Sequence, residues 1–190
     1  VSGTHGKTST TAMLTQILIN GGKDPTAIIG GKLPFIGGNG RVGSSENMVC
    51  EACEYVDTFL QLTPAVSIIL NVDADHLDYF KDLDHIIRSF HKFASQTTRA
   101  LVINGDDANT RKAVEGIDLP ILTFGLGEGN VYRAVNISAH AGVKEQFTLQ
   151  YRGESLTEIT LSVPGKHNIY NALAAAATAH YLGVAPTDIA

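Results

Sequence analysis

The sequence of 190 residues has no tryptophan, only two cysteines and no excess of basic residues. Lysine and arginine number 14 against 19 acidic residues, for a net charge of -5, so no basic stripe is available to follow a nucleic-acid backbone or an anionic membrane. The apolar runs, such as residues 65–70, are too short to cross a bilayer. We therefore expect neither nucleic acid nor membrane among the partners.

The two cysteines, Cys50 and Cys53, form a C-x2-C pair, a spacing that zinc sites and redox centres also use. A structural zinc site needs four ligands, and no second cysteine pair or close histidine pair completes one. We expect two unreactive, largely buried thiols at the end of a strand. Free thiols and the lack of a leader peptide predict a cytoplasmic protein.

The apolar pattern predicts an α/β fold. With 44% hydrophobic and 17% charged residues, the chain can build a buried core. Between residues 26 and 124, short apolar runs alternate with helical patterns, which indicates βαβ units and a mostly parallel sheet with flanking helices, of the P-loop type. The expected strands are Thr26–Ile29, Met48–Glu51, Ala65–Leu70, Ala100–Ile103 and Pro120–Phe124; the expected helices are Leu83–Ala94 and Asp107–Glu115, the second with Asp106 as its N-cap and Gly116 as its stop.

From residue 129 onward the apolar period changes to two, which indicates an antiparallel meander with turns at Ala141-Gly142 and Arg152-Gly153. An alanine-rich helix is expected to begin near Pro164-Gly165 and to end at Gly183. We predict one domain over residues 1–190, made of a parallel α/β core (1–128), a small antiparallel meander (129–164) and a closing helix (165–190).

The strongest chemical signal is the run Gly3-Thr4-His5-Gly6-Lys7-Thr8-Ser9, which leads into a helical pattern. Backbone N–H groups of such a loop, at a helix N-terminus, concentrate positive potential where phosphate oxygens can lie. Lys7 would reach the β- and γ-phosphates, and Thr8 would offer its hydroxyl to a magnesium ion. Val1 stands where the Walker pattern has glycine, so a flexible helix-entry loop is the alternative for this motif alone.

Carboxylates follow two of the predicted strands. Glu51 ends the strand Met48–Glu51, which suits a magnesium ligand opposite a phosphate loop, and Glu54 and Asp57 are weaker competitors. The residues after Ala65–Leu70 could hold a hard cation or form a solvated acidic turn; they are Asp73, Asp75, His76 and Asp78. Because open α/β sheets bind ligands at the carboxyl ends of their strands, we expect one shared site with the phosphate loop.

Two asparagines, Asn168 and Asn171, lie three residues apart at the start of the last helix. An amide both donates and accepts hydrogen bonds, as recognition of an adenine edge requires. An N-cap and an ordinary helix surface explain the same residues without any ligand.

Taken in chain order, these motifs resemble the central ATPase domain of the Mur ligase family, which builds the peptide stem of the bacterial cell-wall precursor. The matching segments are Gly3–Ser9, Glu51–Tyr55, Asn71–Asp78, Asn104–Asp107 and Gly165–Ala172. Within the family, the forms of the first and third segments, and the loop from Gly37 to Ser45, are most similar to the branch that joins L-alanine to UDP-N-acetylmuramate.

The resemblance implies an ATP-dependent, ADP-forming ligase. A substrate carboxylate would attack the γ-phosphate of ATP, and the amine of the amino acid would then displace phosphate from the acyl phosphate. The residues that the resemblance assigns are Lys7 and His76 for catalysis; Gly3, Thr4, His5, Gly6, Lys7, Thr8 and Ser9 for the nucleotide phosphates; His167, Asn168 and Asn171 for adenine; and Thr8 and Glu51 for one Mg2+ ion with His76 for a second.

Family members also have an N-terminal domain that holds the UDP moiety and a C-terminal domain that closes over the site. We expect both to lie outside residues 1–190, together with the strand that feeds the phosphate loop, and we expect this piece alone to bind nucleotide weakly and not to ligate. The alternatives are a sister Mur or folylpolyglutamate-type ligase, or a P-loop nucleotide switch without ligation.

Overall fold

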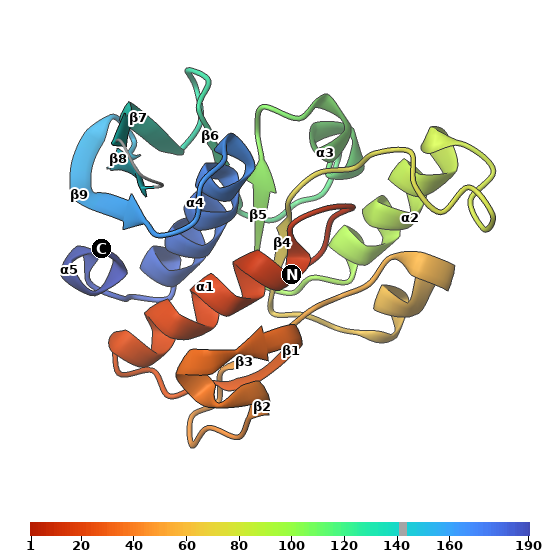
Figure 1. Cartoon of the computed structure of the whole chain (residues 1–190). Coiled ribbons are helices and arrows are strands. Elements are labelled where there is room, and N and C mark those ends of the chain that lie inside the picture. The colour runs from red at the N-terminus through yellow and green to blue at the C-terminus, as the bar shows by residue number, and fades with distance from the viewer. Residues whose placement is uncertain (141–143) are drawn as a thin grey trace.

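The computed structural model describes residues 1–140 and 144–190, which form two sheets with helices packed around them (Figure 1). The larger sheet has six strands in the order β4-β5-β6-β7-β8-β9, and the smaller has three in the order β2-β1-β3. The strands are β1 (Thr26–Leu33), β2 (Gly38–Arg41), β3 (Met48–Cys50), β4 (Val66–Ile69), β5 (Ala100–Asn104), β6 (Ile121–Gly125), β7 (Tyr132–His140), β8 (Lys144–Tyr151) and β9 (Glu154–Leu161).

The α/β fold class is confirmed. Strands β4, β5, β6 and β7 run parallel, in a register that pairs Ile68 with Val102 and Phe124 with Tyr132. The predicted meander is present as β7, β8 and β9, and it continues the parallel sheet. Its turn at Arg152-Gly153 has left-handed backbone at both residues, whereas the predicted turn at Ala141-Gly142 lies outside the described residues.

The small sheet departs from the sequence prediction. The expected strands near Thr26 and Met48 exist and pair in parallel, but they form a separate sheet with β2. The segment from Gly37 to Ser45 was expected to be a loop, yet it contains β2, whose Gly40 pairs with Ile28. A strand rich in glycine carries no alternating apolar pattern, so only its pairing with β1 reveals it.

Helices cover both faces of the large sheet (Figure 1). On one face lie α1 (Lys7–Asn20) and α4 (Lys166–Tyr181), and the alanines of α4 are buried, which allows close packing. On the other lie α2 (Leu83–Ser95), α3 (Ala108–Ala113) and the 3-10 helix η2 (Tyr55–Gln61). The remaining short helices are η1 (Pro34–Ile36) and α5 (Pro186–Ile189). Successive strand residues supply the two cores, since Val102 faces α4 and its neighbour Ile103 faces α2.

The N-cap predicted for α3 is wrong by one residue. Asp107 caps the helix, because its Oδ1 accepts from the backbone N–H of Asn109 at 2.7 Å and of Thr110 at 3.2 Å. Asp106 instead accepts from the N–H of Leu126 at 2.6 Å, outside the helix. Gly116 has a φ of 77°, which fits its predicted role after the helix.

The first two residues of the chain join the two sheets. The nitrogen of Val1 donates to the carbonyl of Cys50, and the carbonyl of Val1 accepts from Ala52, both at 2.8 Å. On the other side, the N–H of Ser2 donates to the carbonyl of Ile68 in β4, and the carbonyl of Ser2 accepts from the N–H of Leu70. This short extended segment lies between β3 and β4 and therefore brings the ends of both strands beside the phosphate loop.

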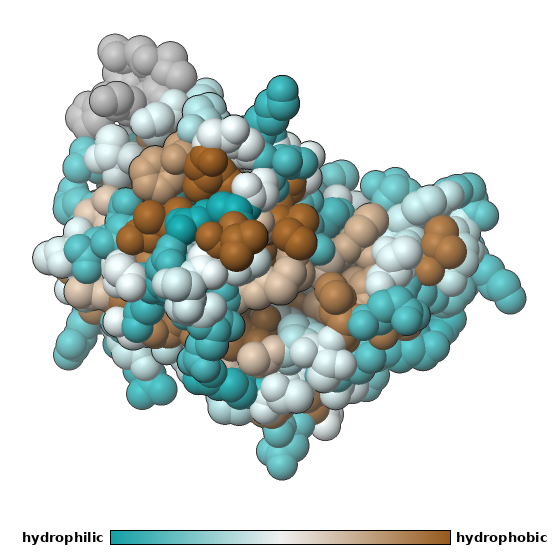
Figure 2. Space-filling model, turned by 90° about the horizontal axis from the view of Figure 1, so that it is seen from below, coloured by the Kyte–Doolittle hydropathy of each residue, from teal (hydrophilic) through white to brown (hydrophobic). Residues whose placement is uncertain are grey.

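The surface carries exposed apolar side chains on and around the small sheet, namely Ile28, Phe35, Val42 and Met48. Figure 2 views this side of the molecule from below and shows apolar atoms interspersed with polar ones. Among residues 1–140 and 144–190, no helix combines the length and apolar character needed to span a membrane.

Candidate phosphate site

The phosphate loop closes over the N-terminus of α1, and two of its glycines are needed for that path. Gly6 caps the helix with a φ of 89°, and a Cβ there would lie 2.3 Å from Oδ1 of Asn171. Gly3 has a φ of 134°, and a Cβ there would lie 2.9 Å from Cβ of Leu70. Side chains would therefore force apart the loop, α4 and the end of β4.

The loop is fixed to the segment that follows β4. The N–H of Thr4 donates to the carbonyl of Asn71 at 3.1 Å, and the N–H of His5 donates to Oδ1 of Asn71 at 2.7 Å. The N–H of Asp73 donates to Oγ1 of Thr4 at 2.9 Å. The predicted convergence of the phosphate loop and the acidic run after β4 is thus present in the structure.

Lys7 reaches back across the loop. Its Nζ donates to the carbonyl of Gly3 at 2.7 Å and to Oε2 of Glu54 at 2.9 Å. Glu54 is only 2% exposed, so this ion pair is shielded from water on the carboxylate side. Sequence reasoning ranked Glu54 below Glu51 as a ligand and did not foresee its contact with the lysine.

Thr8 and Glu51 form the pair of oxygen donors that the sequence predicted. Thr8 Oγ1 donates to Oε2 of Glu51 at 3.1 Å, and the N–H of Gly30 donates to Oε1 at 2.5 Å. A hydroxyl and a carboxylate beside a phosphate loop are hard oxygen ligands that suit Mg2+. Gly30 was not foreseen as part of the site.

His76 lies beside Glu54 and Tyr55. Its Nε2 is 3.8 Å from Oε1 of Glu54, and its ring centroid is 4.7 Å from that of Tyr55. The Tyr55 hydroxyl donates to Asp78 at 2.9 Å, and this hydrogen bond raises the pKa of the phenol. His76 itself has left-handed backbone, with a φ of 53°.

The acidic residues around His76 do not share a hydrogen-bond partner. Asp75 accepts from the backbone N–H of His76, and Asp78 accepts from Tyr55, while Asp73 is exposed. In the part of the chain that the structure describes, no three histidine, cysteine or acidic side chains are gathered as a metal cluster.

The cysteine prediction is wrong in one respect. Both thiols are free, and Cys50 is half-buried at the end of β3, but Cys53 is exposed. The strand ends at Cys50, so Cys53 lies in the following turn and not on a buried strand face.

The predicted adenine residues lie at the start of α4, next to the phosphate loop. Asn168 and Asn171 are 9% and 5% exposed, and Nδ2 of Asn171 donates to Oδ1 of Asn168 at 3.2 Å. Asn168 Nδ2 donates in turn to the carbonyl of Pro164 at 2.7 Å. His167 is exposed and precedes them on the helix. Asn171 therefore links α4 to Gly6, and its role toward a base stays a prediction.

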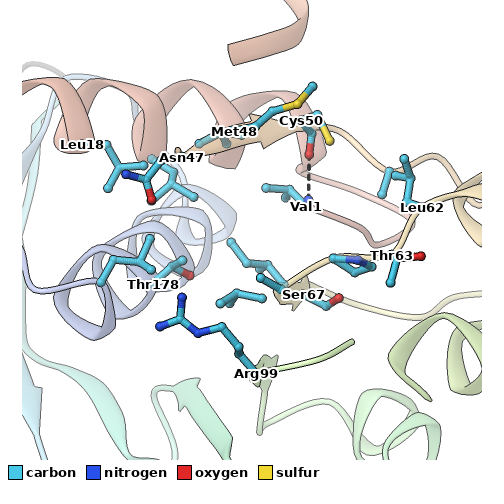
Figure 3. A pocket seen from close by; sticks show the side chains of 18 of the residues that line it. Val1, Leu18, Asn47, Met48, Cys50, Leu62, Thr63, Ser67, Arg99 and Thr178 are labelled. Carbon is cyan, nitrogen blue, oxygen red and sulfur yellow. Dashed lines mark hydrogen bonds between the residues drawn. The ribbon is translucent and has the colours of Figure 1, made fainter. Parts of the chain in front are cut away.

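A cavity of about 460 Å³ lies away from the phosphate loop, between β3 and β4 (Figure 3). Val1, Cys50 and Ser67 line it, with Leu18 of α1 and Arg99 at its sides. None of the residues that line it belongs to the loop Gly3–Ser9. The cavity thus belongs to the framework of the sheets and not to the phosphate site.

Comparison with known proteins places these observations in a family. A sequence model described as the Mur ligase middle domain matches residues 1–179. The chain is 47% identical over 186 residues to the UDP-N-acetylmuramate–L-alanine ligase of Caldanaerobacter subterraneus subsp. tengcongensis, covering 97% of this chain and 40% of that protein. It is 46% identical over 186 residues to the enzyme of the same name from Caldicellulosiruptor bescii, covering 97% of this chain and 41% of that protein.

Solved structures of Mur ligases also match this chain. UDP-N-acetylmuramate-alanine ligase MurC from Thermotoga maritima matches with a TM-score of 0.84 at 30% identity, over 98% of this chain and 42% of that one. The UDP-N-acetylmuramate:L-alanyl-gamma-D-glutamyl-meso-diaminopimelate ligase from Neisseria meningitides matches with a TM-score of 0.86 at 28% identity, over 98% and 62%. The chain therefore spans about 40% of the length of the curated relatives it matches.

Proposed function

We propose, from the premise that this chain belongs to the Mur ligase family as its middle domain, that it is the ATP-binding part of a ligase joining L-alanine to UDP-N-acetylmuramate. The observation that carries the proposal is the contact between the phosphate loop and Glu51. Thr8 follows Lys7 on this loop, and its Oγ1 lies 3.1 Å from Oε2 of Glu51. The L-alanine branch is supported by the two relatives of that name.

The chemistry requires one anion to attack another. A carboxylate oxygen of UDP-N-acetylmuramate attacks the γ-phosphorus of ATP, the bond to ADP breaks, and an acyl phosphate forms. The amine of L-alanine then attacks the acyl carbon, which forms the amide, expels phosphate and releases a proton. Positive charge at the phosphates is therefore essential, and the Lys7 ammonium with the N–H groups of residues 3–8 supplies it.

Magnesium fits the donor set at this edge of the sheet. Thr8 and Glu51 would hold one ion at the β- and γ-phosphates, and His76 would contribute to a second near the transferred group. When bound, such ions neutralise charge on the phosphate oxygens. Adenine would lie against His167, Asn168 and Asn171 at the start of α4.

We assign the sites for the UDP moiety and for the amino acid to other domains of the ligase. We propose that this chain alone binds nucleotide weakly and does not ligate, because closure of a further domain completes the site. The free thiols of Cys50 and Cys53 support a reducing compartment such as the cytoplasm.

The test is phosphate release by the complete ligase polypeptide with Mg-ATP and UDP-N-acetylmuramate. L-Alanine, glycine, L-serine, D-glutamate and no amino acid are compared. We expect release that depends on L-alanine, and near-complete loss in Lys7→Ala. Release with another amino acid or carboxylate would move the protein to a sister ligase or a folylpolyglutamate-type enzyme. A folded, ATP-binding protein without amino-acid-dependent release would contradict the proposal and favour a nucleotide switch.

A further inference from the structure

Glu54 carries a charge in a place where a charge is costly. Its side chain is 3% exposed, and a buried carboxylate is retained only where it is paired and hydrogen-bonded. Both oxygens accept from Lys7 Nζ, at 3.1 Å and 2.9 Å, and Oε1 also lies 3.8 Å from Nε2 of His76. One carboxylate therefore connects the phosphate loop to the segment after β4.

The backbone around Glu54 is strained. Val56 and Asp57, two and three residues after it, have left-handed φ values of 54° and 55°, and His76 has a φ of 53°. For a β-branched residue such as Val56 this conformation is a true outlier, and it persists only where the surrounding structure holds it. Two of these three residues follow Glu54 closely in the chain, and the third, His76, has its Nε2 3.8 Å from the Glu54 carboxylate.

Side-chain contacts hold this strained segment in place. Asp57 accepts from the Tyr79 hydroxyl at 2.8 Å and also from Ser89 of α2. The Tyr55 ring packs on His76 and its hydroxyl is anchored to Asp78. The contacts of Tyr55 and Asp57 thus hold in place the segment that follows Glu54.

We propose that Glu54 is a positioning residue, which holds the Lys7 ammonium and the His76 ring in a fixed relation for phosphoryl transfer. This inference rests on the proposed function. Glu54 itself repels phosphate, so it adds nothing to the attraction of ATP for the site. Its contribution lies in orientation, and interactions that matter only in the transition state affect kcat and not KM.

The experiment measures kcat and KM for ATP in the complete ligase, with saturating UDP-N-acetylmuramate and L-alanine. Glu54→Gln keeps the shape and removes the charge; Glu54→Asp keeps the charge and withdraws it by one methylene. Glu46→Gln is the matched control, because Glu46 is exposed and precedes the same strand, β3. We expect both Glu54 variants to lower kcat by about 10- to 100-fold with an unchanged or lower KM for ATP, and the control to behave as wild type.

A kcat of Glu54→Gln within about threefold of wild type, or a loss confined to KM, would overturn the proposal. So would a normal kcat for Glu54→Asp beside a low one for Glu54→Gln, because charge alone would then suffice. If circular dichroism shows that Glu54→Gln does not fold, Glu54→Asp against Glu46→Gln decides the question. An inactive, folded wild type refutes the proposed function, whereas an active wild type with an unaffected Glu54→Gln refutes only the role of Glu54.

Discussion

The backbone N–H of Gly30 donates to Oε1 of Glu51 at 2.5 Å, and a Cβ on residue 30 would lie 2.9 Å from both carboxylate oxygens. Strand β1 thus orients the carboxylate that faces Thr8. The atoms in the way are the far end of a flexible side chain, so a methyl group at this position would displace the carboxylate and leave the sheet intact.

The Gly30→Ala variant is therefore expected to fold normally. We expect it to weaken magnesium-dependent nucleotide binding by about 10-fold, because a group that orients a metal ligand, here the Glu51 carboxylate, typically has an effect of this size. Isothermal titration with ADP, with and without Mg2+, measures this. Gly38→Ala is the matched control, because a Cβ there meets nothing within 4 Å. Equal magnesium dependence in both variants would show that Gly30 does not orient the ligand.

The Lys7–Glu54 pair predicts a coupled effect on stability. Lys7→Met leaves the Glu54 carboxylate buried without its cation. We expect the free energy of unfolding to fall by roughly 2–4 kcal/mol. This is less than for a fully buried pair, because Lys7 is partly exposed. Adding Glu54→Gln should restore at least half of that loss. Urea unfolding of the single and double variants measures both values, and simple additivity would contradict the pairing.

Asp106 predicts a dependence of stability on acid. Burial alone would raise the pKa of its carboxyl, but hydrogen bonds from Leu126, Tyr170, Asn130 and Gly127 outweigh it and lower the pKa. The ionised carboxylate therefore stabilises the fold above pH about 4, and this contribution is lost as the pH falls through the lowered pKa. Because Asp106 is exposed, solvent screening reduces its contribution, so Asp106→Asn should cost about 1 kcal/mol or less at pH 7 and progressively less as the pH falls below about 4. A difference that stays constant with pH would rule out this explanation.

The cavity beside Val1 predicts that an added strand would stabilise the chain. The nitrogen of Val1 lies between β3 and β4 and donates to the carbonyl of Cys50, so residues placed before it would continue between the two strands. Six apolar, β-branched residues placed before Val1 should raise Tm by about 5 °C or more, because they fill the cavity between the sheets. A glycine and serine extension of the same length is the control. Equal Tm values would show that the cavity does not accept a strand.

Periodicity and motif position were enough to predict helices α1 to α4, most strands and the meeting of the phosphate loop with Glu51, but not η1, η2 or α5. They could not predict the contact of Glu54 with Lys7, because the chain after Glu54 takes a left-handed conformation at Val56, which a β-branched residue rarely adopts. They also led to the wrong cap for α3, Asp106 in place of Asp107, since either carboxylate suits a helix N-terminus. The contact of Asp106 with the backbone of Leu126, distant in sequence, decides it.

The origin of the oxygen in the released phosphate tests the proposed ligase chemistry most directly. UDP-N-acetylmuramate labelled with oxygen-18 in its carboxylate is turned over by the complete ligase with ATP and L-alanine, and the phosphate is analysed by mass spectrometry. Attack by the carboxylate predicts that each phosphate carries one oxygen from the labelled group. Phosphate without label would mean that water attacks ATP, which would contradict the ligase and leave a nucleotide hydrolase or switch.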